Sequence, residues 1–426
     1  MTLKNLSAAF LLAACGSAHA GLEITVSGGE VAARPIAIVP FAQPAGTGTN
    51  LADIIAADLA RSGQFQPLPT ADMLERPTDA TRVDYRNWRL VGVDNVVVGE
   101  LRRVAGRLSV RFQLLDVLRA STLAAYDVEV PDARRLRPVA HQIADLVYEK
   151  LLGIPGYFNS QIAYVAAQGQ GPSRLFQIVV ADADGVNPVT VATSREPLMS
   201  PSWSPDRRQL AYVGFERGRS AIYIHTLATG HLRRFVQERG INGAPAWSPD
   251  GRELAVTLSF ERNPDIYVID VATGARRRVT DHFAIDTEPA WSPDGRHIAF
   301  TSDRGGQPQV YIVGAAGGEP RRVTFQGRQN LRPRYSPDGR SLVLVNVDET
   351  GYRIGLLDLS TRALRVLSDG PLDESPGFAP NGAVVIYAAQ GQQGAELATV
   401  TVDGRIRQRL SQPGDVREPT WSSLIR

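Results

Sequence analysis

The chain has 426 residues, of which 43% are hydrophobic and 21% charged, a composition typical of soluble globular proteins and unlike that of disordered or collagen-like chains. Lys and Arg total 46 and Asp and Glu total 44, and the resulting net charge of +2 argues against nucleic acid as a partner. The 39 glycines and 28 prolines, with β-branched and aromatic runs between them, favour many short strands. A chain of this length is expected to form two domains.

Residues 1–20 have the pattern of a secretory signal peptide. Lys4 precedes an apolar stretch at residues 6–14, and the small-residue triplet Ala18-His19-Ala20 follows. We therefore expect cleavage before Gly21 and a periplasmic mature chain without a transmembrane segment, since no later stretch approaches about 20 apolar residues. A lipobox-like sequence ending at Cys15 leaves a second interpretation, in which this cysteine is lipidated and kept.

Residues 21–156 mix helical and strand periods and predict an α/β domain. Residues 35–41 form a buried-strand pattern, and Asn50 is suited to be the N-cap of a helix that ends at Gly63. Strands are expected over residues 96–104, 108–117 and 123–130, and a second helix over residues 134–152. Residues 153–156 are expected to join this domain to the remainder of the chain.

Residues 157–426 contain a repeat in which a proline is followed two residues later by an aromatic residue. The separations between these aromatic residues are 44, 44, 44, 43 and 43. The six pairs are Pro201 and Trp203, Pro245 and Trp247, Pro289 and Trp291, Pro333 and Tyr335, Pro376 and Phe378, and Pro419 and Trp421. Ser-Pro-Asp-Gly or a close variant follows the first five aromatic residues and suits a type I turn. Four short strands per repeat of this length predict a six-bladed β-propeller.

The two ends of the repeat array complement each other. The last repeat stops near Trp421, and the strands that should follow this residue are missing. The beginning of the array has three strand patterns that no aromatic strand precedes. They lie at residues 162–165, 176–179 and 189–191. We therefore expect the C-terminal strand to complete the first blade and close the ring, which removes two exposed sheet edges.

Motifs of catalytic sites are missing from the sequence. The six histidines lack metal-ligand spacing, and neither a Gly-x-Ser-x-Gly elbow nor a phosphate-cradling glycine motif occurs. The aspartates of the repeated turns could be read as calcium ligands, but their position in a tight turn favours a structural role. We expect no enzymatic activity, no cofactor and no metal. The alternative is a periplasmic hydrolase or lyase acting on peptide or glycan, which requires acid, base or metal groups clustered in the central funnel.

Function is expected where the repeats differ, in the residues just before each repeat proline. Because these residues occupy one phase of a circular repeat, they must lie on one rim of the propeller. A set of solvated loops without a partner is the alternative interpretation. The charged residues predicted on this rim are Asp286, Glu288, Asp373, Glu374, Glu418, Arg332 and Arg417.

Taken together, these features resemble the TolB family, the periplasmic propeller proteins of the Tol-Pal system. The resemblance extends over essentially the whole chain. Besides the signal peptide and the six repeats, it is carried by the sequences at residues 35–41 (PIAIVPF), 59–65 (LARSGQF), 148–150 (YEK) and 162–165 (IAYV). The repeats alone would be a weaker indication, because they also occur in exported proteins of other functions.

The resemblance implies a monomeric, non-enzymatic adaptor that maintains outer-membrane integrity and supports envelope constriction during cell division. It implies that the rim binds the peptidoglycan-associated lipoprotein Pal through Asn242, Gly243, Ala244, Thr287, Glu288 and Glu374. Ile241 departs from the family pattern, which has a histidine there. The resemblance also implies that residues 21–28 bind the inner-membrane-anchored protein TolA. In this segment Leu22, Ile24 and Val26 alternate with polar residues, so that it could add as a strand to a sheet edge.

Overall fold

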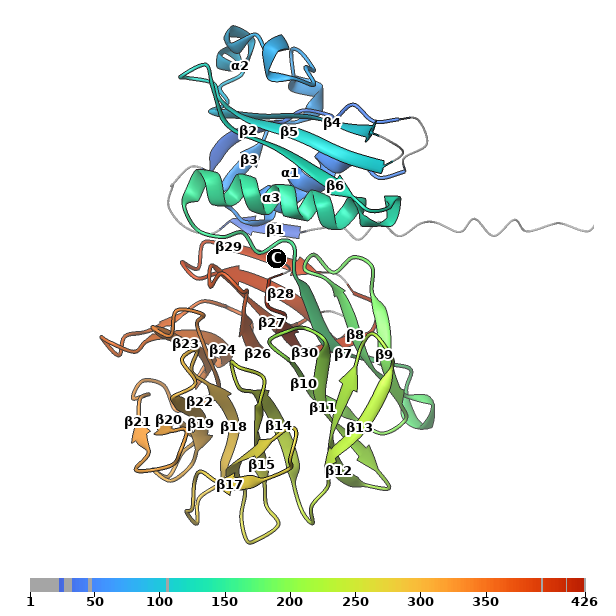
Figure 1. Cartoon of the computed structure of the whole chain (residues 1–426). Coiled ribbons are helices and arrows are strands. Elements are labelled where there is room, and N and C mark those ends of the chain that lie inside the picture. Colours follow the sequence, from blue (N-terminus) through green and yellow to red (C-terminus); the bar gives the residue numbers. More distant parts are fainter. Residues whose placement is uncertain are drawn as a thin grey trace, which may run out of the picture.

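The computed structural model describes residues 23–26, 33–44, 48–104, 107–391, 394–410 and 412–424. The predicted fold class is confirmed, because an α/β region precedes a six-bladed β-propeller (Figure 1). The signal peptide predicted at residues 1–20 and its cleavage site before Gly21 lie outside the described residues. Within the described ranges, no helix combines the length and the apolar character needed to cross a membrane.

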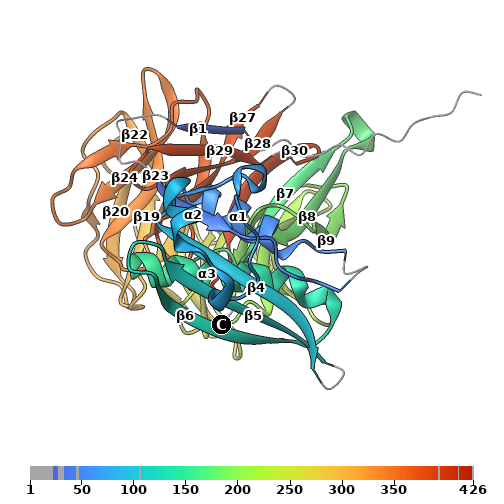
Figure 2. The ribbon, with the colours of Figure 1, turned by 90° about the horizontal axis from the view of Figure 1, so that it is seen from above.

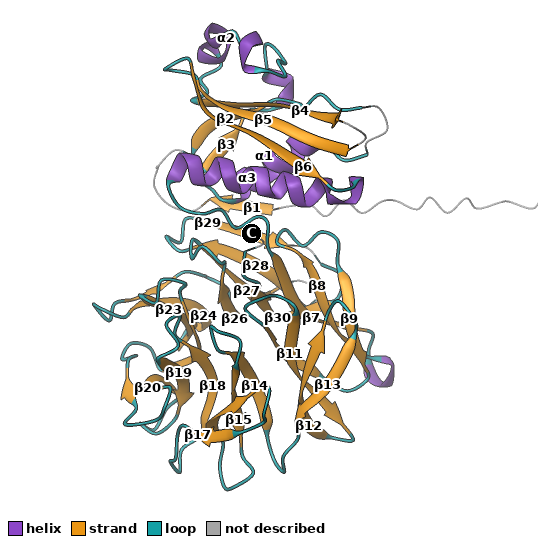
Figure 3. Ribbon diagram, viewed as in Figure 1, coloured by secondary structure: helices purple, strands orange, loops and turns teal. Residues whose placement is uncertain are grey.

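A five-stranded mixed sheet forms the centre of the α/β region. The elements are β2 (Arg34–Ile38), α1 (Leu51–Arg61), β3 (Phe65–Pro67), η1 (Thr70–Asp72), η2 (Ala80–Arg82), α2 (Tyr85–Leu90), β4 (Asn95–Val104), β5 (Arg107–Asp116), β6 (Ser121–Val130), η3 (Ala133–Arg135) and α3 (Leu136–Leu152). The strand order is β3-β2-β4-β5-β6, with β2 parallel to both of its neighbours and the remaining pairs antiparallel. Helices α1 and α3 cover one face of the sheet, and the segment with α2 covers the other (Figure 3).

The two long helices form where the sequence predicts them. The side chain of Asn50 accepts a hydrogen bond from the Asp53 backbone N at 3.4 Å and caps α1. Helix α3 ends at Gly153, whose φ of 75° is left-handed and therefore suits glycine. Each helix buries one apolar stripe against the sheet and the propeller.

The propeller consists of six antiparallel blades. Blade 1 contains β30 (Asp415–Trp421), β7 (Gln161–Gln168), η4 (Gly171–Ser173), β8 (Leu175–Asp182) and β9 (Val189–Ser194). Blade 2 contains β10 (Leu198–Trp203), β11 (Gln209–Glu216), β12 (Arg219–Thr226) and β13 (His231–Val236), and blade 3 contains β14 (Asn242–Trp247), β15 (Glu253–Leu258), β16 (Asp265–Asp270) and β17 (Arg276–Arg278). Blade 4 contains β18 (Asp286–Trp291), β19 (His297–Ser302), β20 (Gln309–Gly314) and β21 (Arg321–Arg322), and blade 5 contains β22 (Gln329–Tyr335), β23 (Ser341–Asp348), β24 (Gly351–Asp358) and β25 (Leu364–Val366). Blade 6 contains β26 (Glu374–Phe378), β27 (Val384–Gln390), β28 (Ala395–Thr401) and β29 (Ile406–Leu410), with β1 (Glu23–Val26) as a fifth, outermost strand.

The Ser-Pro-Asp-Gly sequences form the predicted tight turns. In blade 3 the Gly251 N donates to Ser248 O at 2.9 Å, while Asp250 Oδ1 accepts from Ser248 Oγ at 2.6 Å and from Arg252 N at 3.1 Å. These bonds lower the pKa of Asp250, the Ser248 hydroxyl having the largest effect. The turn aspartates therefore have a structural role.

The C-terminal strand closes the ring, as the sequence predicts. Strand β30 pairs antiparallel with β7, with Trp421 opposite Ile162. The Trp421 indole N donates to Ser160 Oγ at 2.8 Å, and its ring packs edge-on against Tyr157 with 5.6 Å between the centroids. Residues from the two ends of the array thus share one hydrophobic core.

The α/β region packs on one end of blades 6 and 1 (Figure 2). We call the end that carries the Ser-Pro-Asp-Gly turns the turn end, and the opposite end, where the innermost strands begin, the rim. The contacts between the two parts lie at the turn end, where Asn381 Nδ2 donates to Pro155 O at 2.9 Å and Gln408 Nε2 donates to Arg61 O at 3.0 Å. The rim therefore faces away from this contact.

Candidate functional site at the propeller rim

A ring of six residues with left-handed backbone lies at the rim, one residue in each blade. Each of them immediately precedes a repeat proline. They are Ser200, Ala244, Glu288, Arg332, Ser375 and Glu418, with φ angles between 48° and 57°. The pairing of each innermost strand with the next strand shifts register at this point, which marks a β-bulge. A non-glycine residue in this conformation costs about 1–2 kcal/mol. The fold therefore imposes the same backbone conformation at this position in all six blades, and the blades differ here only in their side chains.

A cavity of about 420 Å³ lies between the innermost strands. The six residues above, which we call the rim ring, line it together with four of the repeat prolines, the six aromatic residues and the prolines of the turns. A second set of lining residues, which we call the inner ring, lies between each repeat proline and its aromatic residue. It consists of Ser202, Ala246, Ala290, Arg334, Gly377 and Thr420. The cavity is thus a channel along the propeller axis.

Arg332 connects the acidic residues of the rim ring. Its Nε donates to Glu288 Oε1 at 2.6 Å, its Nη2 lies 3.6 Å from Glu418 Oε1, and its Nη1 donates to Ser375 Oγ. Glu288 Oε2 also accepts from the Arg332 backbone N and from Thr301 Oγ1, both at 3.0 Å. The charged side chains at the channel mouth therefore form one ion-paired cluster, which suits a preformed binding surface.

The rim residues implied by the resemblance differ in exposure. Gly243, Ala244, Thr287, Glu288 and Glu374 are partly exposed. Asn242 is only 1% exposed, and its Nδ2 donates to Glu238 O at 2.8 Å and to Ser220 O at 3.1 Å. Its side chain therefore holds the preceding loop and is not presented to solvent.

Two of the five carboxylates that the sequence places on the rim point inward. Asp286 is fully buried and accepts from Arg304 Nη2 at 2.7 Å, while Asp373 is buried and accepts from Gly370 N at 3.0 Å. Burial raises the pKa of Asp373. The rim thus exposes fewer carboxylates than the sequence predicts, because the phase of a repeat places a residue at the rim without fixing its side-chain direction.

Apart from Ile241, the exposed apolar side chains on the rim were missed by reasoning from the sequence. Phe283 is 85% exposed and Ile285 50%, in the loop before β18. Ile241 in the loop before β14, Leu372 in the loop before β26 and Met199 on β10 are also exposed. Large apolar residues inside short polar loops are the sequence signal that could have identified them. Because these side chains recur on four blades at one end of the propeller, they indicate a surface that another molecule covers.

The described part of the N-terminal segment implied in partner binding, residues 23–26, lies on the propeller itself. Ile24 and Val26 belong to β1, which pairs antiparallel with β29; Ile24 lies opposite Gln408 and Val26 opposite Ile406. Leu22 lies outside the described residues. One edge of the segment is therefore already paired within blade 6, as Figure 1 shows.

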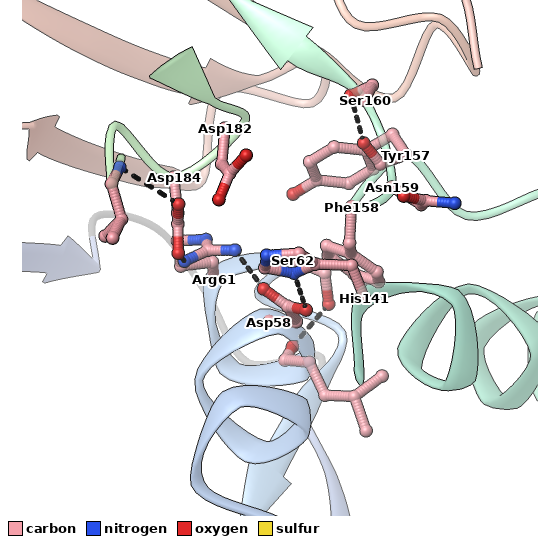
Figure 4. A network of polar contacts seen from close by, with 12 residues as sticks. Asp58, Arg61, Ser62, His141, Tyr157, Phe158, Asn159, Ser160, Asp182 and Asp184 are labelled. Atoms are coloured by element: carbon pink, nitrogen blue, oxygen red, sulfur yellow. Dashed lines mark hydrogen bonds and ion pairs between the residues drawn. The ribbon is translucent and has the colours of Figure 1, made fainter. Parts of the chain in front are cut away.

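A second cluster of charged side chains joins the α/β region to blade 1 (Figure 4). His141 on α3 is 3% exposed, and its Nδ1 lies 2.6 Å from Asp58 Oδ2 on α1. Asp58 also pairs with Arg61, and Arg61 Nη1 lies 3.3 Å from Asp184 Oδ2 in the loop after β8. Arg137 Nε donates to Asp182 Oδ2 at 2.9 Å, and Arg137 also pairs with Asp184. Partly buried ion pairs thus connect the two parts of the protein.

His141 is an exception to the expectation that the histidines stand apart from metal-ligand groups. One ligand atom each of His141, Asp182 and Asp184 lies within 4.8 Å of the others. Arg137 occupies both carboxylates, which makes this arrangement an ion-pair network. Burial opposes the charged form of the imidazole, but the carboxylates of Asp58 and Asp184 outweigh that effect and raise the pKa of His141.

Asp145 lies one turn after His141 on α3 and binds the segment that leads to blade 1. Its carboxylate accepts from Phe158 N at 2.8 Å and from Asn159 N at 3.0 Å. Burial raises the pKa of Asp145 to about 7, although these two hydrogen bonds act in the opposite direction. Two groups at the junction, His141 and Asp145, therefore bind protons more tightly than they do in water.

Comparison with known proteins gives matches for both parts of the chain. Residues 22–123 match the family model described as the TolB amino-terminal domain, and residues 148–425 match the model described as the TolB beta propeller domain. A curated relative from Methylococcus capsulatus, named Tol-Pal system protein TolB, is 58% identical over 97% of this chain and 96% of its own length. The protein of the same name from Nitrosococcus oceani is 59% identical over 95% of this chain and 94% of its own length.

A solved structure gives the same result. The crystal structure of TolB from Acinetobacter baumannii superimposes with a TM-score of 0.86 at 38% sequence identity, and the match covers 95% of this chain and all of that one. Both the α/β region and the propeller are included in a match of this extent. From its two domain matches, its curated relatives and this structural agreement, the chain belongs to the TolB family and is a component of the Tol-Pal system of the cell envelope.

Proposed function

We propose that the protein is a non-enzymatic periplasmic adaptor of the Tol-Pal system. It binds the lipoprotein Pal at the propeller rim and TolA through its N-terminal segment, and in this way it maintains outer-membrane integrity and supports envelope constriction during cell division. The observation that carries the proposal is the arc of exposed apolar side chains on the rim, next to the fixed ion-paired cluster of Glu288, Arg332 and Glu418. An apolar surface with a satisfied polar cluster beside it is typical of protein-binding sites.

We propose no reaction because the carboxylates that line the channel and those of the turns beside it are already engaged. Glu288 and Glu418 are both engaged by Arg332, and the turn aspartates are engaged by serine hydroxyls and backbone N–H groups. A general acid or base needs a side chain that is free to exchange a proton with a substrate. The carboxylates around the channel are instead held in ion pairs and hydrogen bonds, which favours binding over catalysis.

The Pal site is tested by a bulky cation on the rim. Thr287 is partly exposed between Asp286 and Glu288, so Thr287→Arg should weaken binding of the soluble domain of Pal by about 1–3 kcal/mol without changing the fold. The matched control is Thr229→Arg, at an exposed position in the loop between β12 and β13 at the turn end. Both variants are titrated against Pal by calorimetry, and melting curves report their folding. If Thr287→Arg and Glu288→Arg both bind as well as the parent, the Pal site is not on the rim.

The TolA site is tested by removing the N-terminal segment. Strand β29 holds one edge of β1, so TolA must use the other edge or displace β29. A variant without residues 21–28 should lose binding to the soluble domain of TolA and keep binding to Pal. It should also melt within a few degrees of the parent, because blade 6 retains four strands. Unchanged TolA binding by this variant would place the TolA site elsewhere.

A further inference from the structure

The inner ring of the channel contains one large cation among small side chains. Five of its six positions carry serine, alanine, glycine or threonine, and blade 5 alone contributes an arginine, Arg334. All six positions line the cavity. The small residues leave space beside the Arg334 side chain, and two of them, Ser202 and Thr420, also contribute hydroxyl groups to the ring.

The guanidinium of Arg334 has few partners within the described ranges. It carries five N–H donors, and its one side-chain hydrogen bond runs from Nη1 to Pro333 O at 2.8 Å. The nearby carboxylates of Glu288 and Glu418 are both engaged by Arg332. Burial lowers the pKa of Arg334, and the two glutamates do not offset this effect. Arg334 is only partly exposed to the channel and has no hydrogen-bonded anion among the described residues, so the site favours a counter-ion.

We propose that the propeller channel binds a small oxyanion, a carboxylate or phosphate group, through Arg334. The planar fork of N–H donors in a guanidinium matches two oxygens of such a group, and a charge-assisted bond of this kind is roughly twice as strong as a neutral one. The cavity of about 420 Å³ has room for an ion of this size. Arg334 belongs to the inner ring, and the channel joins it to the rim ring, whose Ala244 and Glu288 are also part of the surface proposed for Pal.

Titration of the purified full-length protein tests the proposal. Sodium phosphate and sodium acetate are added in separate calorimetric titrations, each against sodium chloride at equal ionic strength. We expect saturable binding of at least one of them, and the arm that binds identifies the group. Arg334→Ala should weaken that binding roughly ten- to a hundredfold. The matched control is Arg296→Ala, which removes an exposed arginine from the turn of blade 4 and should bind like the parent.

A crystallographic experiment locates the anion directly and tests the proposal even if Arg334→Ala does not fold. Crystals of the parent soaked in selenate should show an anomalous peak within hydrogen-bond distance of the Arg334 guanidinium, and Arg334→Lys should weaken binding less than Arg334→Ala. The proposal is overturned if the parent binds neither anion saturably or if Arg334→Ala binds as the parent does. Where phosphate is the anion that binds, selenate found only at other positions overturns it as well.

Discussion

Replacement of Asp58 by asparagine should weaken the junction between the α/β region and blade 1. The asparagine side chain would keep the size of the aspartate but would lose the charge that pairs with Arg61 and His141. Breaking a buried ion pair by removing one partner costs about 3–5 kcal/mol. Arg61 would still have Asp184 as a partner, since its Nη1 lies 3.3 Å from Asp184 Oδ2. We therefore expect a loss near the lower end of this range, about 3 kcal/mol in the free energy of unfolding at pH 6.

The pH dependence of this loss follows from the raised pKa of His141. The stabilisation from protonated His141 is fully present below its unfolded pKa of about 6.5 and disappears as the pH rises through the higher folded value. Asp145 acts in the same direction, because its folded pKa of about 7 exceeds the unfolded value of 3.8, so the folded state loses stability as the pH rises toward and past 7. The stability of the parent should therefore fall from pH 6 to pH 8.5, and that of Asp58→Asn should fall less.

Urea denaturation between pH 5.5 and 8.5, followed by tryptophan fluorescence, measures both effects. The control is Glu149→Gln, which removes an exposed carboxylate from α3 and should follow the parent at every pH. A loss below 1 kcal/mol at pH 6, or a pH profile of Asp58→Asn parallel to that of the parent, would refute the reasoning about this cluster.

Three further changes test the architecture. Trp421→Ala removes the aromatic residue that closes blade 1 and should cost about 3–5 kcal/mol in urea denaturation, so a variant that unfolds like the parent would contradict its role in closure. Gly63→Ala should destabilise the protein by clearly more than Gly92→Ala: both glycines have positive φ, but a Cβ at Gly63 would lie 2.3 Å from Ile406 Cγ1, whereas one at Gly92 meets nothing within 4 Å. Equal melting temperatures for the two variants would show that this contact relaxes freely. Ala244→Gly relieves a φ of 48° and should raise the stability by about 1 kcal/mol, while Ala244→Val should lower it.

The features that the sequence predicts are those encoded within one repeat. A proline two residues before an aromatic residue marks a strand and recurs six times, and Ser-Pro-Asp-Gly or a close variant marks a turn after the first five. This recurrence is enough to predict the ring and its closure by β30. Asn50 and Gly153 are equally local signals, one for the start of a helix and the other for the end of one.

The features that escaped prediction depend on contacts between distant parts of the chain. The alternation of Leu22, Ile24 and Val26 predicts a strand, but β1 pairs with β29, far along the sequence, and no short-range pattern reveals that partner. Asp58, His141 and Asp184 come from three separate elements, and only the packing of α1 and α3 on blade 1 brings them together. At the rim, the repeat phase located Asn242 correctly in the chain but could not show that its amide turns inward.

The fifth strand of blade 6 has a mechanical consequence. Strand β1 is held by four residue pairs with β29, and backbone hydrogen bonds contribute only about 0.5–1.5 kcal/mol each. Ring closure depends on β30 and β7 instead, so tension applied to the N-terminal segment would be released by peeling β1 from the outside of the molecule. The propeller would stay closed under such a load, and the strand could reattach when the load ends. A load on the N-terminal side would therefore detach β1 before it opened the folded body.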